Sequence, residues 1–117
     1  MKHGQFTIDM LNVDVHVLVG GKQQQVMQRC AKILGSEIDE IDLSGHDGFA
    51  AVHGRTAVIW LDETSDIGII THEAYHAVHR IMKYIGLENK GEEWSAHLMG
   101  YVCKQTVNIL EQSEDTK

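Results

Sequence analysis

The chain has 117 residues, of which 43% are hydrophobic and 23% are charged, and its formal net charge is −7. This length predicts one domain over residues 1–117, with a frayed polar tail over residues 112–117. The negative charge argues against nucleic acid as a partner. The longest apolar run, near Ala57 to Leu61, is too short to span a membrane, and no apolar segment of a secretory signal follows the N-terminus. We therefore expect a cytoplasmic protein.

The first elements predicted along the chain are a strand and a helix. Phe6 to Val19 contains valines at positions 13, 15 and 17 that alternate with polar residues, as in a half-buried strand. Lys22 to Leu34 then carries apolar residues at helical spacing. Gly35 is expected to cap this helix at its C-terminal end.

Two further strands are predicted in the middle of the chain. Ser36 to Ser44 can form either a loop or a short strand, and both alternatives stay open. Gly48 to His53 and Thr56 to Leu61 are rich in strand-forming residues on either side of a glycine-containing turn. This arrangement predicts a hairpin.

Two helices complete the predicted fold. The first runs from about Ile67 to Tyr84, ends at Gly86, and begins after one of three capping residues, Thr64, Ser65 or Asp66. The second runs from about Glu92 to Glu111. Together these elements predict an α+β domain with a small, mostly antiparallel sheet.

The helix over Ile67 to Tyr84 contains the most informative motif of the chain, His72-Glu73-Ala74-Tyr75-His76. Histidines four residues apart are about one helical turn apart (pitch about 5.4 Å) and face the same side, so both rings can reach one Zn²⁺ ion. Glu73 can then act as general base on a zinc-activated water. The alternative is a solvated helix in which this spacing is a coincidence.

A catalytic zinc ion needs a third protein ligand, with one position left for water. The metzincin class places a histidine six residues after the second histidine of the motif, where this chain has Met82. His79 lies about 10 Å along the axis from His72, so one ion cannot readily hold both. The remaining candidates are Cys103, Glu92 and Glu93.

One face of the final helix suggests how an acidic ligand could reach the motif helix. Spacings of three and four residues place five side chains on this face: Glu93, Ala96, His97, Gly100 and Tyr101. Ala96 and Gly100 are small, so we expect this face to approach the motif helix closely. The alternative is that these small residues serve packing alone and that Glu93 is a solvated acid of the first helical turn.

An HExxH motif on one helix, followed by Glu-x-x-small on the next, resembles the gluzincin class of zinc metallopeptidases. The stretch from Thr56 to Val102 resembles minimal, stand-alone forms of that class, including those encoded by phages and prophages. This resemblance implies a zincin-like fold in which the motif helix packs against a C-terminal helix that bears the glutamate ligand. It also implies that the strand from Thr56 to Leu61 borders the cleft and can pair with an extended peptide.

The resemblance further implies Zn²⁺ as the cofactor, Glu73 as the base, and three metal ligands, namely His72, His76 and Glu93. Many gluzincins have an aspartate four residues after the glutamate ligand, and this chain has His97 at that position. The implied activity is hydrolysis of peptide bonds in a peptide or protein substrate.

The oxyanion formed during such a reaction needs a hydrogen-bond donor besides zinc, and Tyr101, His97 and His79 are the candidates. Two other functions stay open. The chain can be a catalytically silent zinc-binding domain of phage or prophage type, or a protein-interaction module in which the motif is incidental.

Overall fold

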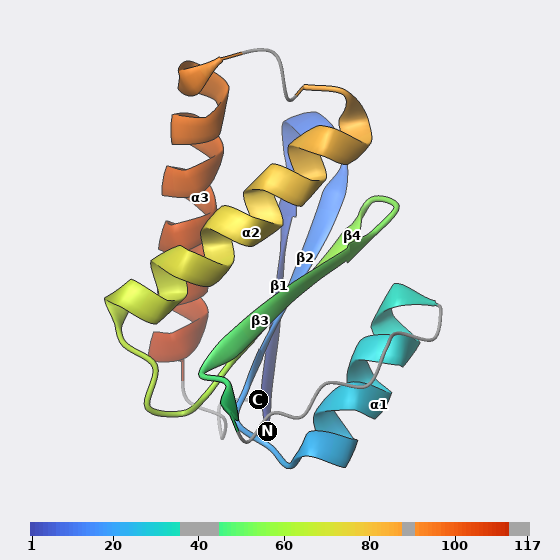
Figure 1. The fold of residues 1–117 in the computed structure, drawn as a ribbon, viewed down its shortest axis with the longest axis vertical. Helices are drawn as coiled ribbons and strands as arrows, with labels where there is room; N and C mark the ends of the chain where they lie inside the picture. The colour runs from blue at the N-terminus through green and yellow to red at the C-terminus, as the bar shows by residue number, and fades with distance from the viewer. Residues whose placement is uncertain (36–44, 88–90, 113–117) are drawn as a thin grey trace.

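A computed structural model of the chain describes residues 1–35, 45–87 and 91–112. These residues form an α+β fold of one four-stranded sheet, three α-helices and a short 3-10 helix, η1 (Asp9–Leu11) (Figure 1). The other elements follow in the order β1 (Lys2–Ile8), β2 (Val13–Val19), α1 (Gln23–Leu34), β3 (Gly48–His53), β4 (Thr56–Leu61), α2 (Ile67–Ile85) and α3 (Glu92–Glu111).

The sheet is mixed, with the strand order β1-β2-β4-β3. The pairs β1–β2 and β3–β4 are antiparallel, whereas the central pair β2–β4 is parallel. A parallel pair needs a crossover connection, and α1 lies in the chain between β2 and β4. The expectation of a mostly antiparallel sheet therefore holds for two of the three pairings, and the parallel centre was not predicted.

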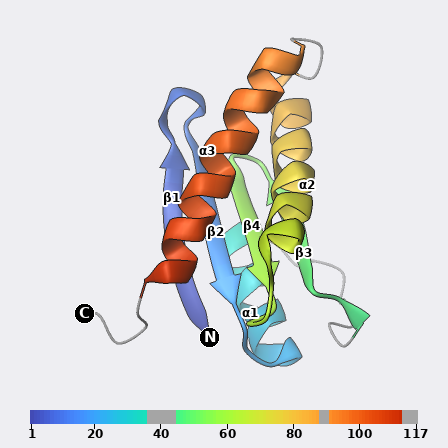
Figure 2. The same cartoon turned by 90° about the vertical axis from the view of Figure 1, so that its left-hand side faces the viewer.

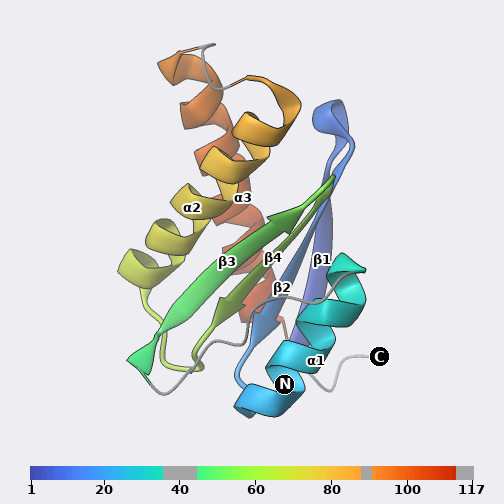
Figure 3. The ribbon, with the colours of Figure 1, turned by 45° about the vertical axis from the view of Figure 1, so that its right-hand side comes forward.

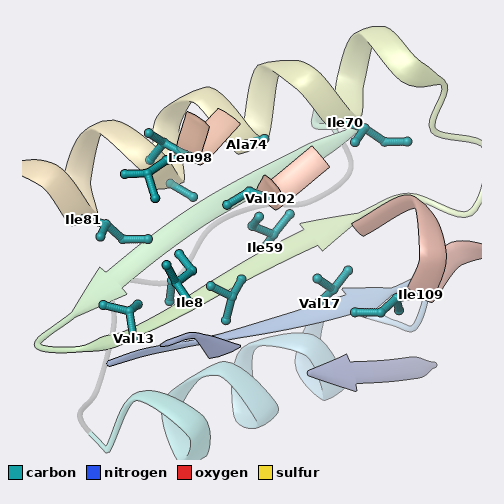
Figure 4. Close-up of a cluster of buried hydrophobic side chains, with 14 of the residues drawn as sticks. Ile8, Val13, Val17, Ile59, Ile70, Ala74, Ile81, Leu98, Val102 and Ile109 are labelled. Carbon is teal, nitrogen blue, oxygen red and sulfur yellow. The ribbon is translucent and has the colours of Figure 1, made fainter. Parts of the chain in front are cut away.

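The helices cover both faces of the sheet. Figure 3 shows α1 on one face and α2 and α3 on the other, and Figure 2 shows α3 crossing β1 and β2. Alternate residues of β4 enter the two layers, since Ala57, Ile59 and Leu61 belong to the cluster under α2 and α3 while Val58 and Trp60 belong to the cluster under α1. A strand buried on both faces is continuously apolar for this reason. Figure 4 shows the larger cluster, which supports the motif helix from below.

The N-terminal hairpin differs from the single strand expected within Phe6 to Val19. The chain forms β1, turns through η1, and returns as β2. Asn12 adopts a left-handed conformation with φ of 54° and closes this turn. Asparagine tolerates that conformation better than most residues, so a turn without glycine or proline is possible here.

The helix boundaries agree closely with the predicted ones. Asp66 caps α2, because its side chain accepts a hydrogen bond of 3.1 Å from the backbone N–H of Ile69. Gly86 and Gly35 end α2 and α1 in the left-handed conformation. None of the helices within the described ranges is long and apolar enough to cross a membrane. Ser36 to Ser44 and residues 113–117 of the predicted tail lie outside the described residues.

Candidate metal and catalytic site

The two histidines of the motif lie side by side on α2, one helical turn apart. The Nε2 atoms of His72 and His76 are 3.2 Å apart, and the ring centroids are 4.7 Å apart with an interplanar angle of 81°. His72 is exposed and His76 is half-buried. The spacing of the motif therefore brings both rings together at the surface, as predicted.

The separation of the two Nε2 atoms fits a shared metal ion. Zinc binds histidine nitrogen at about 2.0–2.1 Å in tetrahedral geometry, which places two nitrogen ligands about 3.3 Å apart. The observed separation of 3.2 Å matches this distance between two nitrogen ligands. A neutral pair can satisfy the same separation with an N–H···N hydrogen bond, so the geometry suits the rings with or without a metal ion.

Glu73 occupies a different environment from the two histidines. It is 6% exposed and lies on the side of α2 that faces β3. Burial raises the pKa of the Glu73 carboxyl above its ordinary value, and nearby positive charge opposes this increase, with His72 and His76 as the largest contributors. A carboxyl with a raised pKa is a stronger base than an exposed glutamate, and this one lies beside two imidazoles.

The buried position of Glu73 depends on Gly48 at the start of β3. A Cβ atom at Gly48 would lie 2.9 Å from Cγ of Glu73 and 2.9 Å from the carbonyl oxygen of Trp60. Neither neighbour leaves room for a larger residue, because one is a buried side chain and the other is backbone. The absence of a side chain at Gly48 therefore lets the motif helix lie against the sheet at this point.

The structure does not bring Glu93 to the histidine pair. Ser95 contacts Met82, with Oγ 3.5 Å from Sδ, and Cys103 is hydrogen-bonded to Thr71. These contacts set the antiparallel course of α3 along α2 and place Glu93 near or beyond the level of Met82. That level is about 9 Å along the axis from His76 and about 15 Å from His72.

The expected close approach of the small residues is also wrong. Ala96 and Gly100 are exposed, and a Cβ atom at Gly100 would meet nothing within 4 Å. The Glu93 side chain is 91% exposed. The face that carries these residues points away from α2, because the opposite side of α3 supplies the buried residues of the helix.

The other candidate ligands also stay apart from the pair. His79 packs its ring against Tyr75 at a centroid distance of 4.5 Å, and the thiol of Cys103 lies beside Thr71. Glu92 lies in the same exposed first turn as Glu93. Over residues 1–35, 45–87 and 91–112, no three His, Cys, Asp or Glu side chains lie close enough together to hold one metal ion.

Tyr101 and His97 lie on the far side of α3 from the histidine pair. The hydroxyl of Tyr101 donates a hydrogen bond of 3.0 Å to the backbone carbonyl of Thr7, and the ring of Tyr101 packs edge-on against Phe6. His97 lies beside Glu93, with Nε2 3.8 Å from a carboxylate oxygen. Both residues, together with Glu93, line a cavity between α3 and the β1–β2 turn.

The strand that borders the motif helix at the sheet edge is β3, not β4. The resemblance assigned this place to Thr56 to Leu61, but β4 lies inside the sheet between β2 and β3. The backbone N–H of Asp62 donates to the carbonyl of Asp47 at 2.8 Å. In an antiparallel pair every second residue bonds to the partner strand, so this contact shows which residues of β3 face β4. The main-chain groups that consequently point away from β4 belong to Gly48, Ala50 and Val52.

Arg80, on the motif helix, contacts this outer edge of β3. Its guanidinium donates to the carbonyl oxygen of Ala50, and its charge opposes the increase that burial causes in the pKa of Glu73. His46, which precedes β3, makes a smaller contribution that also opposes this increase. The spacing within the motif gave no sign of either neighbour, because both depend on how α2 packs across the sheet.

Comparison with protein-family models, with curated proteins and with solved structures gives no match to this chain.

Proposed function

We propose that the chain is a zinc-dependent peptidase whose reaction takes place at the histidine pair of α2. The observation that carries this proposal is the 3.2 Å separation of the Nε2 atoms of His72 and His76, next to the buried carboxyl of Glu73. Zinc, when bound, supplies Lewis acidity that activates water and polarises a carbonyl group. His72 and His76 hold the ion by their Nε2 atoms.

Glu73 moves the protons of the proposed reaction. Its carboxylate takes a proton from the attacking water and returns it to the nitrogen of the leaving amine when the peptide bond breaks. The packing of Glu73 against Gly48 fixes the carboxyl on one side of the histidine pair. The raised pKa makes this carboxylate a stronger base than an exposed glutamate.

The outer edge of β3 is the proposed binding surface for an extended peptide. The outward main-chain groups of Gly48 and Val52 and the N–H of Ala50 can pair with another strand, as in recognition by strand addition. The Ala50 carbonyl accepts from Arg80, so a peptide paired along the whole strand would displace that contact. Gly48 also contacts Glu73, so a peptide paired here passes next to the proposed base.

A second candidate function is zinc binding without hydrolysis. The observation that favours it is the lack of a third ligand beside the histidine pair among the described residues. A site with two protein ligands binds zinc more weakly than one with three, and a catalytic ion is normally held by three.

The test of both functions combines metal binding with peptide cleavage. Zinc is titrated into metal-free protein against a chromophoric chelator, and the zinc-loaded protein is incubated with an unbiased peptide library. We expect one zinc ion per chain, and we expect Glu73→Gln to retain zinc while cleavage falls by at least about 100-fold. Zinc binding without cleavage by the native protein selects the second function. Protein that takes up no zinc, or cleavage that survives in Glu73→Gln, contradicts the proposed peptidase.

A further inference from the structure

A concave site lies on the side of α3 away from the histidine pair, between the first half of α3 and the turn that joins β1 to β2. It is a cavity of about 530 Å³, which is large enough for a small organic molecule. Apolar side chains form most of its wall, namely Ile8, Met10, Trp94 and Leu98. Met10 is 73% exposed, so a large apolar side chain stands at the surface beside the cavity.

The charged groups around this cavity favour a cation. Asp9 on the β1–β2 turn and Glu93 on α3 both line it, and no lysine or arginine of the described residues does. The net charge of −7 adds a long-range attraction for positive ligands. An anionic ligand would meet two carboxylates, and the one lining side chain that can carry a positive charge, His97, lies 3.8 Å from the Glu93 carboxylate.

Trp94 gives the wall a third feature that suits a cation. The face of an indole ring attracts ammonium groups more strongly than other aromatic side chains do. Trp94 is half-buried, so its side chain is accessible to a ligand in the cavity. Apolar walls, two acids and an indole together match a molecule with a positive head and an apolar body.

We propose that this cavity binds a small organic cation, in which an ammonium group is carried by an apolar body. The apolar body contacts Ile8, Met10 and Leu98, and the ammonium group lies towards Asp9 and Glu93. This site does not depend on the proposed zinc chemistry, because the histidine pair lies on the far side of α3.

Three probes of equal chain length test the proposal: hexyltrimethylammonium, hexanol and hexanoate. Binding to the native protein is followed by tryptophan fluorescence and checked by calorimetry. Trp94 lines the cavity while Trp60 is buried under α1, so Trp94→Phe should remove most of the fluorescence change. We expect the cation to bind at least about fivefold more tightly than hexanol, and hexanoate to bind most weakly. Added salt should reduce the advantage of the cation.

Glu93→Gln and its neighbour Glu92→Gln provide a matched pair of variants. Both remove one negative charge from the same helical turn, but only Glu93 lines the cavity. Glu93→Gln should weaken the cation about two- to fivefold and leave hexanol unchanged, while Glu92→Gln should change neither. Asp9→Asn should act like Glu93→Gln. Equal binding of cation and hexanol, equal effects of the two glutamine variants, or no binding of any probe would each overturn the proposal.

Discussion

The histidine pair of α2 and the cavity beside α3 are two separate regions of the molecule. Between them they contain the six residues that the sequence pattern assigned to one site. His72, Glu73 and His76 come together on α2, whereas Glu93, His97 and Tyr101 come together at the cavity. Within each group, spacings of three and four residues along one helix bring the side chains together, and these spacings persist in the folded protein. The two groups are separated because α2 continues from His76 to Ile85 before it ends, a length of about 13 Å. Spacing within a helix therefore predicts contact, and spacing across a helix connection does not.

The largest expected effect comes from removing one residue from each region and measuring zinc affinity, which tests whether the two regions are separate. His76→Ala deletes half of the nitrogen pair, so zinc affinity should fall by more than the roughly 10–100-fold typical of residues that only orient a ligand. Glu93→Gln should change zinc affinity less than about twofold, because its carboxylate lies outside the reach of the pair. Competition with a chromophoric chelator measures both variants.

Thermal unfolding of the metal-free variants is the control for that experiment, since both substitutions affect exposed or half-buried positions and should leave the fold intact. A loss of zinc in Glu93→Gln as large as that in His76→Ala would contradict the placement of α3 along α2. It would also return Glu93 to the role of third ligand.

The parts of the fold that the sequence predicted are those with local causes. Asp66, Gly86 and Gly35 act within one turn of their own helices, so their capping roles could be recognised from residue type and position. The turn closed by Asn12 lacks glycine and proline, and β1 was consequently missed. The parallel pairing of β2 with β4 depends on where α1 carries the chain, which residue patterns along single strands do not encode.

The same holds for the candidate site: its features within one helix were predicted, and its contacts between elements were not. The motif indicated the histidine pair and the candidate base Glu73, because all three are set by helix geometry. The contact of Glu73 with Gly48 and the contact of Arg80 with Ala50 join α2 to β3, and their residues are far apart in sequence. Such contacts follow from packing between elements, for which this one sequence carries no short-range signal.

A second comparison contrasts a glycine that packs against Glu73 with a glycine on the outer face of α3. Gly48→Ala places Cβ against Glu73 and the Trp60 carbonyl, so stability should fall by about 1–3 kcal/mol and the proposed cleavage should decrease. Gly100→Ala adds a methyl group to an exposed helix position with open space, and stability should rise by about 0.5–1 kcal/mol.

Urea unfolding measures both glycine variants, and zinc titration shows whether the histidine pair is intact in each. Zinc affinity should stay nearly unchanged in both, because the atoms nearest to a Cβ at Gly48 belong to Glu73 and Trp60, and a Cβ at Gly100 meets nothing within 4 Å. Equal stability effects in the two variants would contradict the tight contact of Glu73 with β3.

The smallest expected effect concerns the charge of Glu73 in the metal-free protein. Burial raises the pKa of this carboxyl in the folded state, so the folded protein holds this proton more tightly than the unfolded chain does. The resulting stability is fully present below the unfolded pKa of about 4.3 and is lost as pH rises through the folded pKa. Glu73→Gln cannot ionise, so it should unfold at a higher temperature than the native chain at pH 7 and at nearly the same temperature at pH 4. Glu92→Gln, at an exposed position, should leave the unfolding temperature nearly unchanged at both pH values. A stabilisation of Glu73→Gln that is equal at both pH values would show that packing, rather than the buried charge, sets the stability of this position.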